Sequence, residues 1–391
     1  MGQGGIELQG YPHGRPAMNI LYHFRTRGTG AEAVHIAGIV RAFEGMGHGV
    51  ILSSPTGADP RRTAGTSPFA EPGTSTRGWL GRLIFEALEI GYNIPAFFRN
   101  LGLVRRHGCG MIYERHAFFL FSTALVAGLM GRPLVVEVNE LIGDPRVREQ
   151  PVFAGLARWS DRFVFKRARL IVTVSPHLRR RVLEYGITEE RVVVAPNAIS
   201  ARELEAPART ISFGLPASNF LLGFVGWLVE WHRLDFVIDA LAAPEFARVV
   251  LVVIGEGPLR GRLEEQARER GVRIHFHGPL PHADIPAALR AMDACVVPHS
   301  NAYRSPIKLF EFMAQERPIL APRTEPIETV VRDGEEALLF APLEVESFRR
   351  ALLKLLNSKA LCDSLGRAAR RAVEEKHTWE GNAVRIMASI D

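Results

Sequence analysis

The sequence has few cysteines and no apolar run of membrane-spanning length. Only three of its 391 residues are cysteines, and Cys109, Cys295 and Cys362 are too widely spaced to resemble the paired ligands of a metal site. We therefore expect reduced, buried thiols in a cytoplasmic protein, and no metal. The longest apolar run, Ala117 to Met130, is shorter than a membrane span and has polar interruptions, which favours a buried helix.

The patterns of a signal peptide and of a nucleic-acid-binding surface are also missing. Residues 1–17 are Gly-rich and polar, so we expect a disordered tail and no export. The formal charge of +6 and the isoelectric point near 9.5 suit a phosphate-bearing substrate or an anionic membrane surface. Nucleic acid is not an expected partner, because the arginines are scattered and form no groove pattern with aromatic residues.

The most informative stretch, residues 305–314, is predicted to form a loop and a helix between two short strands. Ser305 or Arg304 is placed to cap this helix, and Pro306 suits its first position because proline has no N–H to leave unpaired there. The apolar residues that follow have helical spacing and should face a core.

A cation and a carboxylate lie at the start of this helix. Lys308 and Glu311 are three residues apart and share one edge of the first turn. The free N–H groups and the positive dipole end of a helix N-terminus attract anions, and a carboxylate beside them can accept hydrogen bonds from two vicinal hydroxyls. The pattern favours a phosphate joined to a ribose, although ordinary surface helices also carry such residues.

This stretch resembles the nucleotide-sugar motif of the family 4 glycosyltransferases. These are retaining, metal-independent enzymes with the α/β fold called GT-B, in which two Rossmann-like domains face each other across a cleft. Their motif has two glutamates separated by seven residues; Glu311 matches the second, which binds the donor ribose, and Tyr303 replaces the first. The resemblance implies a hexosyltransferase without a cofactor, whose UDP-sugar, or else GDP- or dTDP-sugar, contacts Arg304, Ser305, Pro306, Ile307, Lys308 and Glu311.

The resemblance also divides the chain into domains. It implies an N-terminal acceptor domain over residues 18–200, a linker over 201–218 and a nucleotide-sugar domain over 219–372. A C-terminal helix within residues 373–391 should pack back onto the N-terminal domain. The Ala- and Pro-rich composition of the linker supports this division.

The first strand, predicted from Met18 to Phe24, is followed by a glycine turn and a helix. In the resembling family this turn touches the donor phosphates or the acceptor. Gly28 and Gly30 fit such a role because glycine lets the backbone approach a ligand closely. A plain tight turn explains the two glycines as well.

Polar residues end two later strands of the same domain. Glu114, Arg115 and His116 end one strand, and Asn139 and Glu140 end the next. Because the carboxyl ends of parallel strands form the ligand crevice, we expect these five residues to gather there. The resemblance puts them on the acceptor side and makes His116 a candidate catalytic imidazole, although a structural histidine is an equal alternative.

The second half of the chain repeats the strand, turn and helix pattern. The family uses the first turn here to bring basic residues to the diphosphate, and in this chain His232 and Arg233 stand in that loop. We expect Arg233 and Lys308 to stabilise the leaving diphosphate, with His232 assisting. Gly278 and Leu280 match the turn that reads the nucleobase through the backbone.

Several alternatives stay open. The basic amphipathic patterns at 79–106 and 158–169 suit peripheral contact with the inner face of a membrane or a lipid-linked acceptor, but also ordinary core-packed helices. The acceptor hydroxyl can belong to a glycan, a lipid-linked molecule or a natural product. A nucleotide-sugar epimerase, with Glu114 and Glu140 as acid and base, and a non-catalytic nucleotide-sugar or glycan-binding protein are the rival functions.

Overall fold

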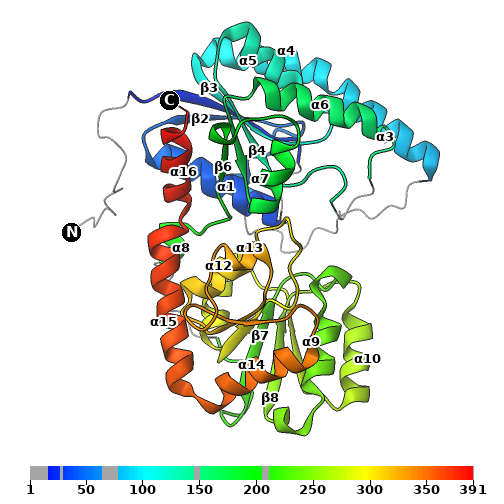
Figure 1. Cartoon of the computed structure of the whole chain (residues 1–391), viewed down its shortest axis with the longest axis vertical. Coiled ribbons are helices and arrows are strands. Elements are labelled where there is room, and N and C mark those ends of the chain that lie inside the picture. The colour runs from blue at the N-terminus through cyan, green and yellow to red at the C-terminus, as the bar shows by residue number, and fades with distance from the viewer. Residues whose placement is uncertain (1–15, 27–29, 64–77, 145–149, 205–210, 391) are drawn as a thin grey trace.

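The computed structural model describes residues 16–26, 30–63, 78–144, 150–204 and 211–390. These residues form two parallel six-stranded sheets, one above the other along the long axis of the molecule (Figure 1). The N-terminal sheet contains β1 (Asn19–His23), β2 (Gly49–Ser53), β3 (Cys109–Arg115), β4 (Leu134–Val138), β5 (Leu170–Thr173) and β6 (Val192–Val194). The C-terminal sheet contains β7 (Phe220–Val225), β8 (Val249–Ile254), β9 (Ile274–Gly278), β10 (Ala294–Val296), β11 (Ile319–Pro322) and β12 (Leu338–Phe340).

The N-terminal sheet has the strand order β2-β1-β3-β4-β5-β6, so its crossovers put helices on both faces. Side chains alternate along β1: Ile20 and Tyr22 contact the core under α1, whereas Leu21 contacts the core on the other face. The helices of this domain are α1 (Gly30–Gly45), α2 (Pro60–Thr63), α3 (Trp79–Gly91), α4 (Asn93–His107), α5 (Ser122–Met130), α6 (Ala154–Arg167) and α7 (Pro176–Leu183).

The C-terminal sheet has the order β12-β11-β10-β7-β8-β9, and its crossovers also put helices on both faces. Its helices are α9 (Leu234–Leu241), α10 (Arg260–Arg270), α11 (Ile285–Arg290), α12 (Ile307–Ala314), α13 (Glu325–Glu328) and α14 (Val345–Asn357). The predicted apolar face of α12 is confirmed, since Leu309, Phe310 and Met313 are fully buried. Burial of side chains of this size stabilises the fold by roughly 1.5–3 kcal/mol each.

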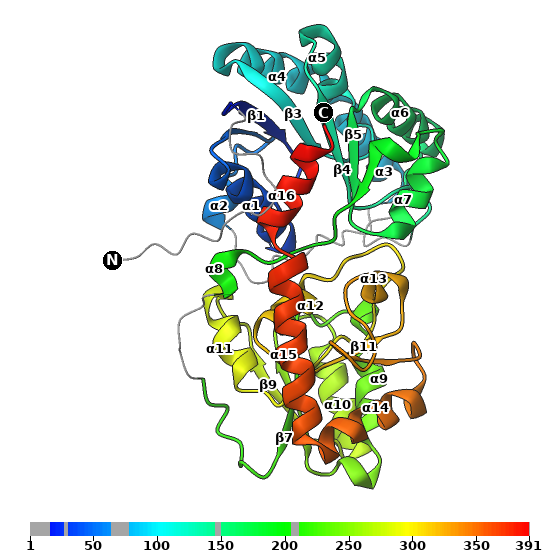
Figure 2. The ribbon, with the colours of Figure 1, turned by 60° about the vertical axis from the view of Figure 1, so that its left-hand side comes forward.

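The chain passes between the domains twice. After β6 it crosses downward through α8 (Ala201–Leu204), a short helix inside the segment predicted to be a linker. It returns through α15 (Lys359–Lys376), which packs on α12, and α16 (Trp379–Ala388), which packs on α1 as the resemblance implied (Figure 2). The contact with α1 is close, because a Cβ at Gly38 would lie 2.4 Å from the Trp379 indole.

The start of α12 differs from the prediction. The helix begins at Ile307, so Pro306 precedes it, and neither Ser305 nor Arg304 caps it. The Ser305 hydroxyl instead accepts a hydrogen bond from the backbone N–H of Asn197 in the other domain, at 3.0 Å. The prediction was wrong because a local capping pattern carries no information about a partner more than a hundred residues away.

Candidate active site

A buried lysine lies at the start of α12. The Lys308 ammonium is 4.1 Å above the centre of the Phe224 ring and 3.5 Å from Nδ1 of His232. Burial lowers the pKa of Lys308 to about 7, and the nearby Glu311 carboxylate only partly offsets this. Gly226, at φ +148°, lines the same site, and a Cβ there would come within 2.8 Å of the ammonium.

His232 is the second basic group of this site. Burial, and the positive charges of Lys308 and Arg304, hold its pKa well below the usual value, so the ring is neutral. With Lys308 donating to Nδ1, the ring proton is on Nε2 and can be donated to an anion. The structure therefore joins two of the predicted donor residues into one cationic, hydrogen-bonding unit.

Arg233 lies directly before α9 but is engaged elsewhere. It has φ +52°, and its guanidinium pairs with the Asp235 carboxylate at 3.0 Å on the half-exposed surface. That pairing raises the pKa of Arg233, which keeps it charged. The Asp235 carboxylate is bound through Nε and Nη2 of Arg233, and a role of Arg233 at the diphosphate stays a prediction.

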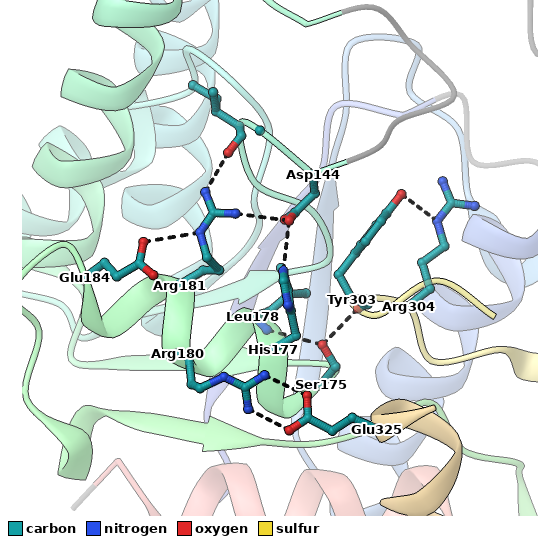
Figure 3. Close-up of polar contacts among 12 residues, drawn as sticks. Asp144, Ser175, His177, Leu178, Arg180, Arg181, Glu184, Tyr303, Arg304 and Glu325 are labelled. Carbon is teal, nitrogen blue, oxygen red and sulfur yellow. Dashed lines mark hydrogen bonds and ion pairs between the residues drawn. The ribbon is translucent and has the colours of Figure 1, made fainter. Parts of the chain in front are cut away.

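Tyr303, at the position of the first motif glutamate, inserts into the core of the N-terminal domain. Its ring is buried among apolar residues of that domain, its carbonyl accepts from the Ser175 hydroxyl at 2.9 Å, and its own hydroxyl accepts from Nε of Arg304 at 3.1 Å (Figure 3). Burial raises the pKa of Tyr303; the charge and hydrogen bond of Arg304 oppose this, and the negative charges of Glu140 and Asp144 add to it. The residue that replaces the glutamate thus joins the two domains.

The predicted ribose-binding residue, Glu311, is paired with a histidine in this structure. Its Oε1 lies 3.1 Å from Nε2 of His282, in the turn after β9. The hydrogen bond to Glu311 raises the pKa of His282 to about 9, although burial opposes this. Glu203, 3.9 Å from the same nitrogen, adds a second negative charge. Sequence reasoning did not find His282, because nothing in the local pattern connects it to Glu311.

The turn predicted to read the base lies beside this pair. Gly278 has φ +84°, and its carbonyl accepts from the Gly255 N–H at 3.0 Å. Leu280 is partly buried against the core that contains α12. Pro306 and Ile307 directly precede Lys308 at the start of α12. The contacts of these residues with a base or a sugar stay a prediction.

At the facing edge of the N-terminal sheet the structure gathers a cluster that sequence reasoning only partly found. Glu137 Oε1 lies 2.8 Å from His35 Nε2, 2.6 Å from Arg115 Nη1 and 2.7 Å from Asn139 Nδ2. Burial alone would raise the pKa of Glu137, but His35 and Arg115 outweigh it and hold the pKa far below its usual value. Arg115 and Asn139 were predicted here; Glu137 was read as a strand residue, and its polarity in a buried strand was the available signal.

Glu114 and His116 do not join that cluster. Glu114 is fully buried, where its carboxylate accepts from the Thr123 hydroxyl and lies 3.3 Å from His23 Nδ1. His116 is buried beside α6, with Nε2 2.9 Å from Asp161 Oδ1. Strand alternation explains this, because Glu114 and His116 point to the face opposite Arg115.

Asn197 connects the N-terminal cluster to the donor loop. Its Oδ1 is 2.6 Å from His35 Nδ1, and its Nδ2 donates to the Ser305 carbonyl at 2.5 Å. Gly30 begins α1, the helix that carries His35, in the left-handed region at φ +64°. Gly28 lies outside the described residues.

Two family models match this chain. The one described as Glycosyltransferase Family 4 matches residues 32–203, and the one described as Glycosyl transferases group 1 matches residues 219–358. The chain belongs to the family 4 glycosyltransferases. In this glycosyltransferase the first match ends and the second begins between β6, the last strand of the N-terminal sheet, and β7, the first strand of the C-terminal sheet.

Curated relatives of this glycosyltransferase cover most of its length. The 2-deoxystreptamine glucosyltransferase of Streptomyces kanamyceticus is 25% identical over 300 residues, which are 73% of this chain and 74% of that protein. The phosphatidyl-myo-inositol mannosyltransferase of Mycobacterium leprae is 27% identical over 240 residues, 60% of this chain and 61% of that one.

Solved structures share its GT-B fold. Anabaena Alr3699/HepE in complex with UDP superposes with a TM-score of 0.69 at 17% identity, covering 95% of this chain and 100% of that one. A glycosyltransferase from Rickettsia africae gives a TM-score of 0.71 at 13% identity, covering 96% and 98%. The fold prediction is therefore confirmed. No helix in the described segments combines the length and apolarity needed to cross a membrane.

Proposed function

We propose that this glycosyltransferase moves a hexosyl group from a nucleoside diphosphate sugar to an acceptor hydroxyl with retention of anomeric configuration. UDP is the favoured nucleotide, with GDP and dTDP as the alternatives. The observation that carries the proposal is the buried Lys308 ammonium beside His232 at the start of α12. The charged form of a buried lysine with a lowered pKa is strongly stabilised when a dianionic group binds beside it.

The diphosphate would lie against Lys308 and His232. There it would receive a charge-assisted hydrogen bond from the ammonium and one from Nε2 of His232. Lys308 belongs to the first turn of α12, whose free N–H groups and helix dipole would add to the attraction. These groups stabilise the negative charge that develops on the leaving diphosphate, which is the main catalytic requirement of such a transfer.

The nucleoside would extend toward Glu311. Its carboxylate can accept from the two ribose hydroxyls once it leaves His282, or can accept from them while His282 holds its other oxygen. The backbone around Gly278 then faces the base. This arrangement uses the motif glutamate as the resemblance implied.

In the proposed transfer the acceptor oxygen attacks the anomeric carbon from the face that the diphosphate leaves. The bond between that carbon and the diphosphate oxygen breaks, and its electron pair stays on the diphosphate. The acceptor proton passes to a departing phosphate oxygen, so no enzymic nucleophile is used. The cluster of Arg115, Glu137 and Asn139 lies on the acceptor side, where it can hold acceptor hydroxyls.

The comparisons support this proposal in two ways. Alr3699/HepE has been solved with UDP and with UDP-glucose, and it shares the fold of this chain. The curated relatives transfer glucosyl or mannosyl groups by their names. We do not extend the proposal to epimerisation, because Glu114, one of the two carboxylates considered for it, is buried against Thr123 and His23.

Calorimetric titration tests the donor site. The protein is titrated with UDP, GDP, dTDP and their glucose or mannose esters, beside a Glu311→Ala variant and a Glu346→Ala control on exposed α14. We expect one nucleotide to bind in the micromolar range, and Glu311→Ala to lose roughly 1.5–3 kcal/mol, as for hydrogen bonds to a charged group. If no nucleotide binds, or both variants bind like the wild type, the donor site is misplaced.

Transfer and retention need a second measurement. The protein is incubated with the nucleotide sugar that binds and with a panel of acceptor alcohols, and the products are examined by proton NMR. An α-linked product from an α-configured donor is the expected outcome. Isomerised donor without product would indicate an epimerase, and binding without either change would indicate a binding protein.

A further inference from the structure

Four neighbouring helices of the N-terminal domain carry nearly all the large apolar side chains that the described residues expose. Twelve such side chains are exposed, and eleven of them belong to α3, α4, α5, α6 or the residue before α6. They are Trp79, Leu80, Ile84, Leu88, Ile94, Phe98, Leu125, Leu129, Phe153, Leu156 and Trp159. A concentration of this kind marks an interaction surface, because single exposed apolar residues are normally scattered.

On each helix the exposed residues have helical spacing. Leu80, Ile84 and Leu88 follow one another every four residues along α3, and Ile94 and Phe98 do the same on α4. Leu88 and Phe98 are both 67% exposed. These stripes are separate from the core-facing ones, since α4 also buries Ala96, Asn100 and Val104. The packing of the domain therefore does not account for the outer stripes.

The helices that carry these stripes are neighbours. α4 packs beside α5 and α5 beside α6, on the face of the sheet opposite α1 and α16 (Figures 1 and 2). Phe121, just before α5, contacts Trp159 and Phe163 of α6 at ring separations of 6.0 and 6.2 Å. Trp159 is itself stacked on Phe163 at 5.3 Å. We call this surface of α3, α4, α5 and α6 the α3–α6 face.

On three of the four helices, α4, α5 and α6, the charge beside these stripes has one sign. Together α4 and α6 contain seven Arg or Lys residues and one acid, and that acid, Asp161, is buried against His116. α5 contains no charged residue. The exposed basic residues on α4 and α6 are Arg105, Arg106, Arg158, Arg162, Lys166 and Arg167. On these two helices, basic and apolar side chains are thus exposed together.

We propose that the α3–α6 face docks on the surface of an anionic lipid bilayer. Exposed leucines, isoleucines and tryptophans would enter the boundary between headgroups and acyl chains, and the basic side chains would pair with anionic headgroups. Trp79 and Trp159 suit that boundary because an indole is apolar yet carries one N–H donor. The proposal does not depend on which sugar or nucleotide the enzyme uses.

Charge complementarity favours a bilayer over a second copy of this chain. A self-contact through this face would bring basic residues of α4 and α6 of one copy close to those of the other, and α4, α5 and α6 expose no carboxylate to compensate. An anionic membrane supplies negative charge and an apolar layer at once.

Vesicle flotation of the full chain tests this directly. Vesicles of phosphatidylcholine with an equal share of phosphatidylglycerol are compared with vesicles of phosphatidylcholine alone. We expect binding to the anionic vesicles, weakened by rising salt, and at least about tenfold weaker binding to the neutral ones. Leu156→Gln/Trp159→Gln and Arg162→Glu/Lys166→Glu should each lower the partition coefficient at least about tenfold.

Matched controls separate docking from general charge and folding effects. Leu343→Gln removes a large exposed apolar side chain that lies outside the face, and Lys354→Glu/Arg367→Glu reverses two exposed charges of the C-terminal domain. Both should bind vesicles like the wild type, and circular dichroism should show all variants folded. The proposal would be overturned if the wild-type protein did not bind anionic vesicles, or if the control variants lost as much binding as the face variants. The proposal would also be overturned if sedimentation showed a dimer that Leu156→Gln/Trp159→Gln dissociates and no vesicle binding were found.

Discussion

Lys308 and His232, 76 residues apart in the chain, form a hydrogen-bonded pair with 3.5 Å between Nζ and Nδ1. The pair lies over the ring of Phe224 and against Gly226, so the ammonium is shielded from water on several sides. A cation held in this way is short of counter-charge until an anion arrives. Its protonation and the binding of a diphosphate are therefore linked.

We expect nucleotide binding to depend on pH through Lys308. Its pKa is lowered to about 7, and a bound diphosphate favours the charged form. Affinity should be greatest below about pH 7 and should fall by up to about tenfold per unit as pH rises further. Above pH 7, binding should also take up a proton, which calorimetry in buffers of different ionisation enthalpy measures.

Lys308→Met is the matching variant for that experiment. It should bind nucleotide about 10 to 100 times more weakly than the wild type, as expected when a charge-assisted hydrogen bond is lost. It should also lose the proton uptake. Unchanged proton uptake in this variant would assign the titration to another group.

His282 should contribute stability that disappears at alkaline pH. Its pKa is raised to about 9 by Glu311, so the contribution is complete below the unfolded value of about 6.5 and is lost as pH rises through 9. Because the ring is partly exposed, we expect His282→Gln to cost about 1–2 kcal/mol at pH 6. Urea unfolding at pH 6 and pH 10 checks this. Equal costs at both pH values would contradict the pairing.

Asn197→Ala should destabilise the protein by about 1–3 kcal/mol. The change leaves His35 Nδ1 and the carbonyl of Ser305 without their partner in a buried position. Asn219→Ala, which removes the exposed hydrogen bond that Asn219 Oδ1 accepts from Arg273, serves as the control and should cost less than about 0.5 kcal/mol. Denaturant unfolding of both variants gives the comparison, and equal costs would argue against the interdomain role.

The interdomain ion pair of Arg180 and Glu325 should affect domain orientation more than stability. Both guanidinium ends bind the carboxylate, at 2.6 and 2.7 Å, but the side chains are 57% and 41% exposed (Figure 3). A double-mutant cycle should give a coupling below about 1 kcal/mol. Arg180→Glu should increase the radius of gyration in X-ray scattering, and the exchanged pair, Arg180→Glu with Glu325→Arg, should restore it.

His116 should prove to be a structural residue. Its Nε2 is committed to the buried Asp161, so His116→Ala leaves a buried carboxylate with only Tyr185 as a side-chain partner and should cost about 3–5 kcal/mol. The kcat of the folded variant should stay within a few-fold of the wild type. A large loss of kcat with unchanged stability would instead support the catalytic role that the sequence suggested.

The strands and turns of this fold follow from local pattern, but the pairs at the site do not. β1 (Asn19–His23) lies within the strand predicted from Met18 to Phe24, and the buried face of α12 follows from its spacing. The pairs His35 with Glu137 and His282 with Glu311 join residues 102 and 29 positions apart. Such pairs are set by how packed elements meet, which the spacing of residues along one element does not encode.

The two crossings between the domains are hydrogen-bonded to each other. Ile199 donates to the His377 carbonyl and accepts from the Trp379 N–H, both at 3.1 Å. We expect the angle between the two domains to change by rotation about this short bridge, because sliding or twisting one domain past the other would break its two hydrogen bonds. A protease cut in either crossing would therefore leave the two halves covalently joined, and after a cut in both they would be held only by noncovalent contacts such as the Tyr303 ring in the N-terminal core.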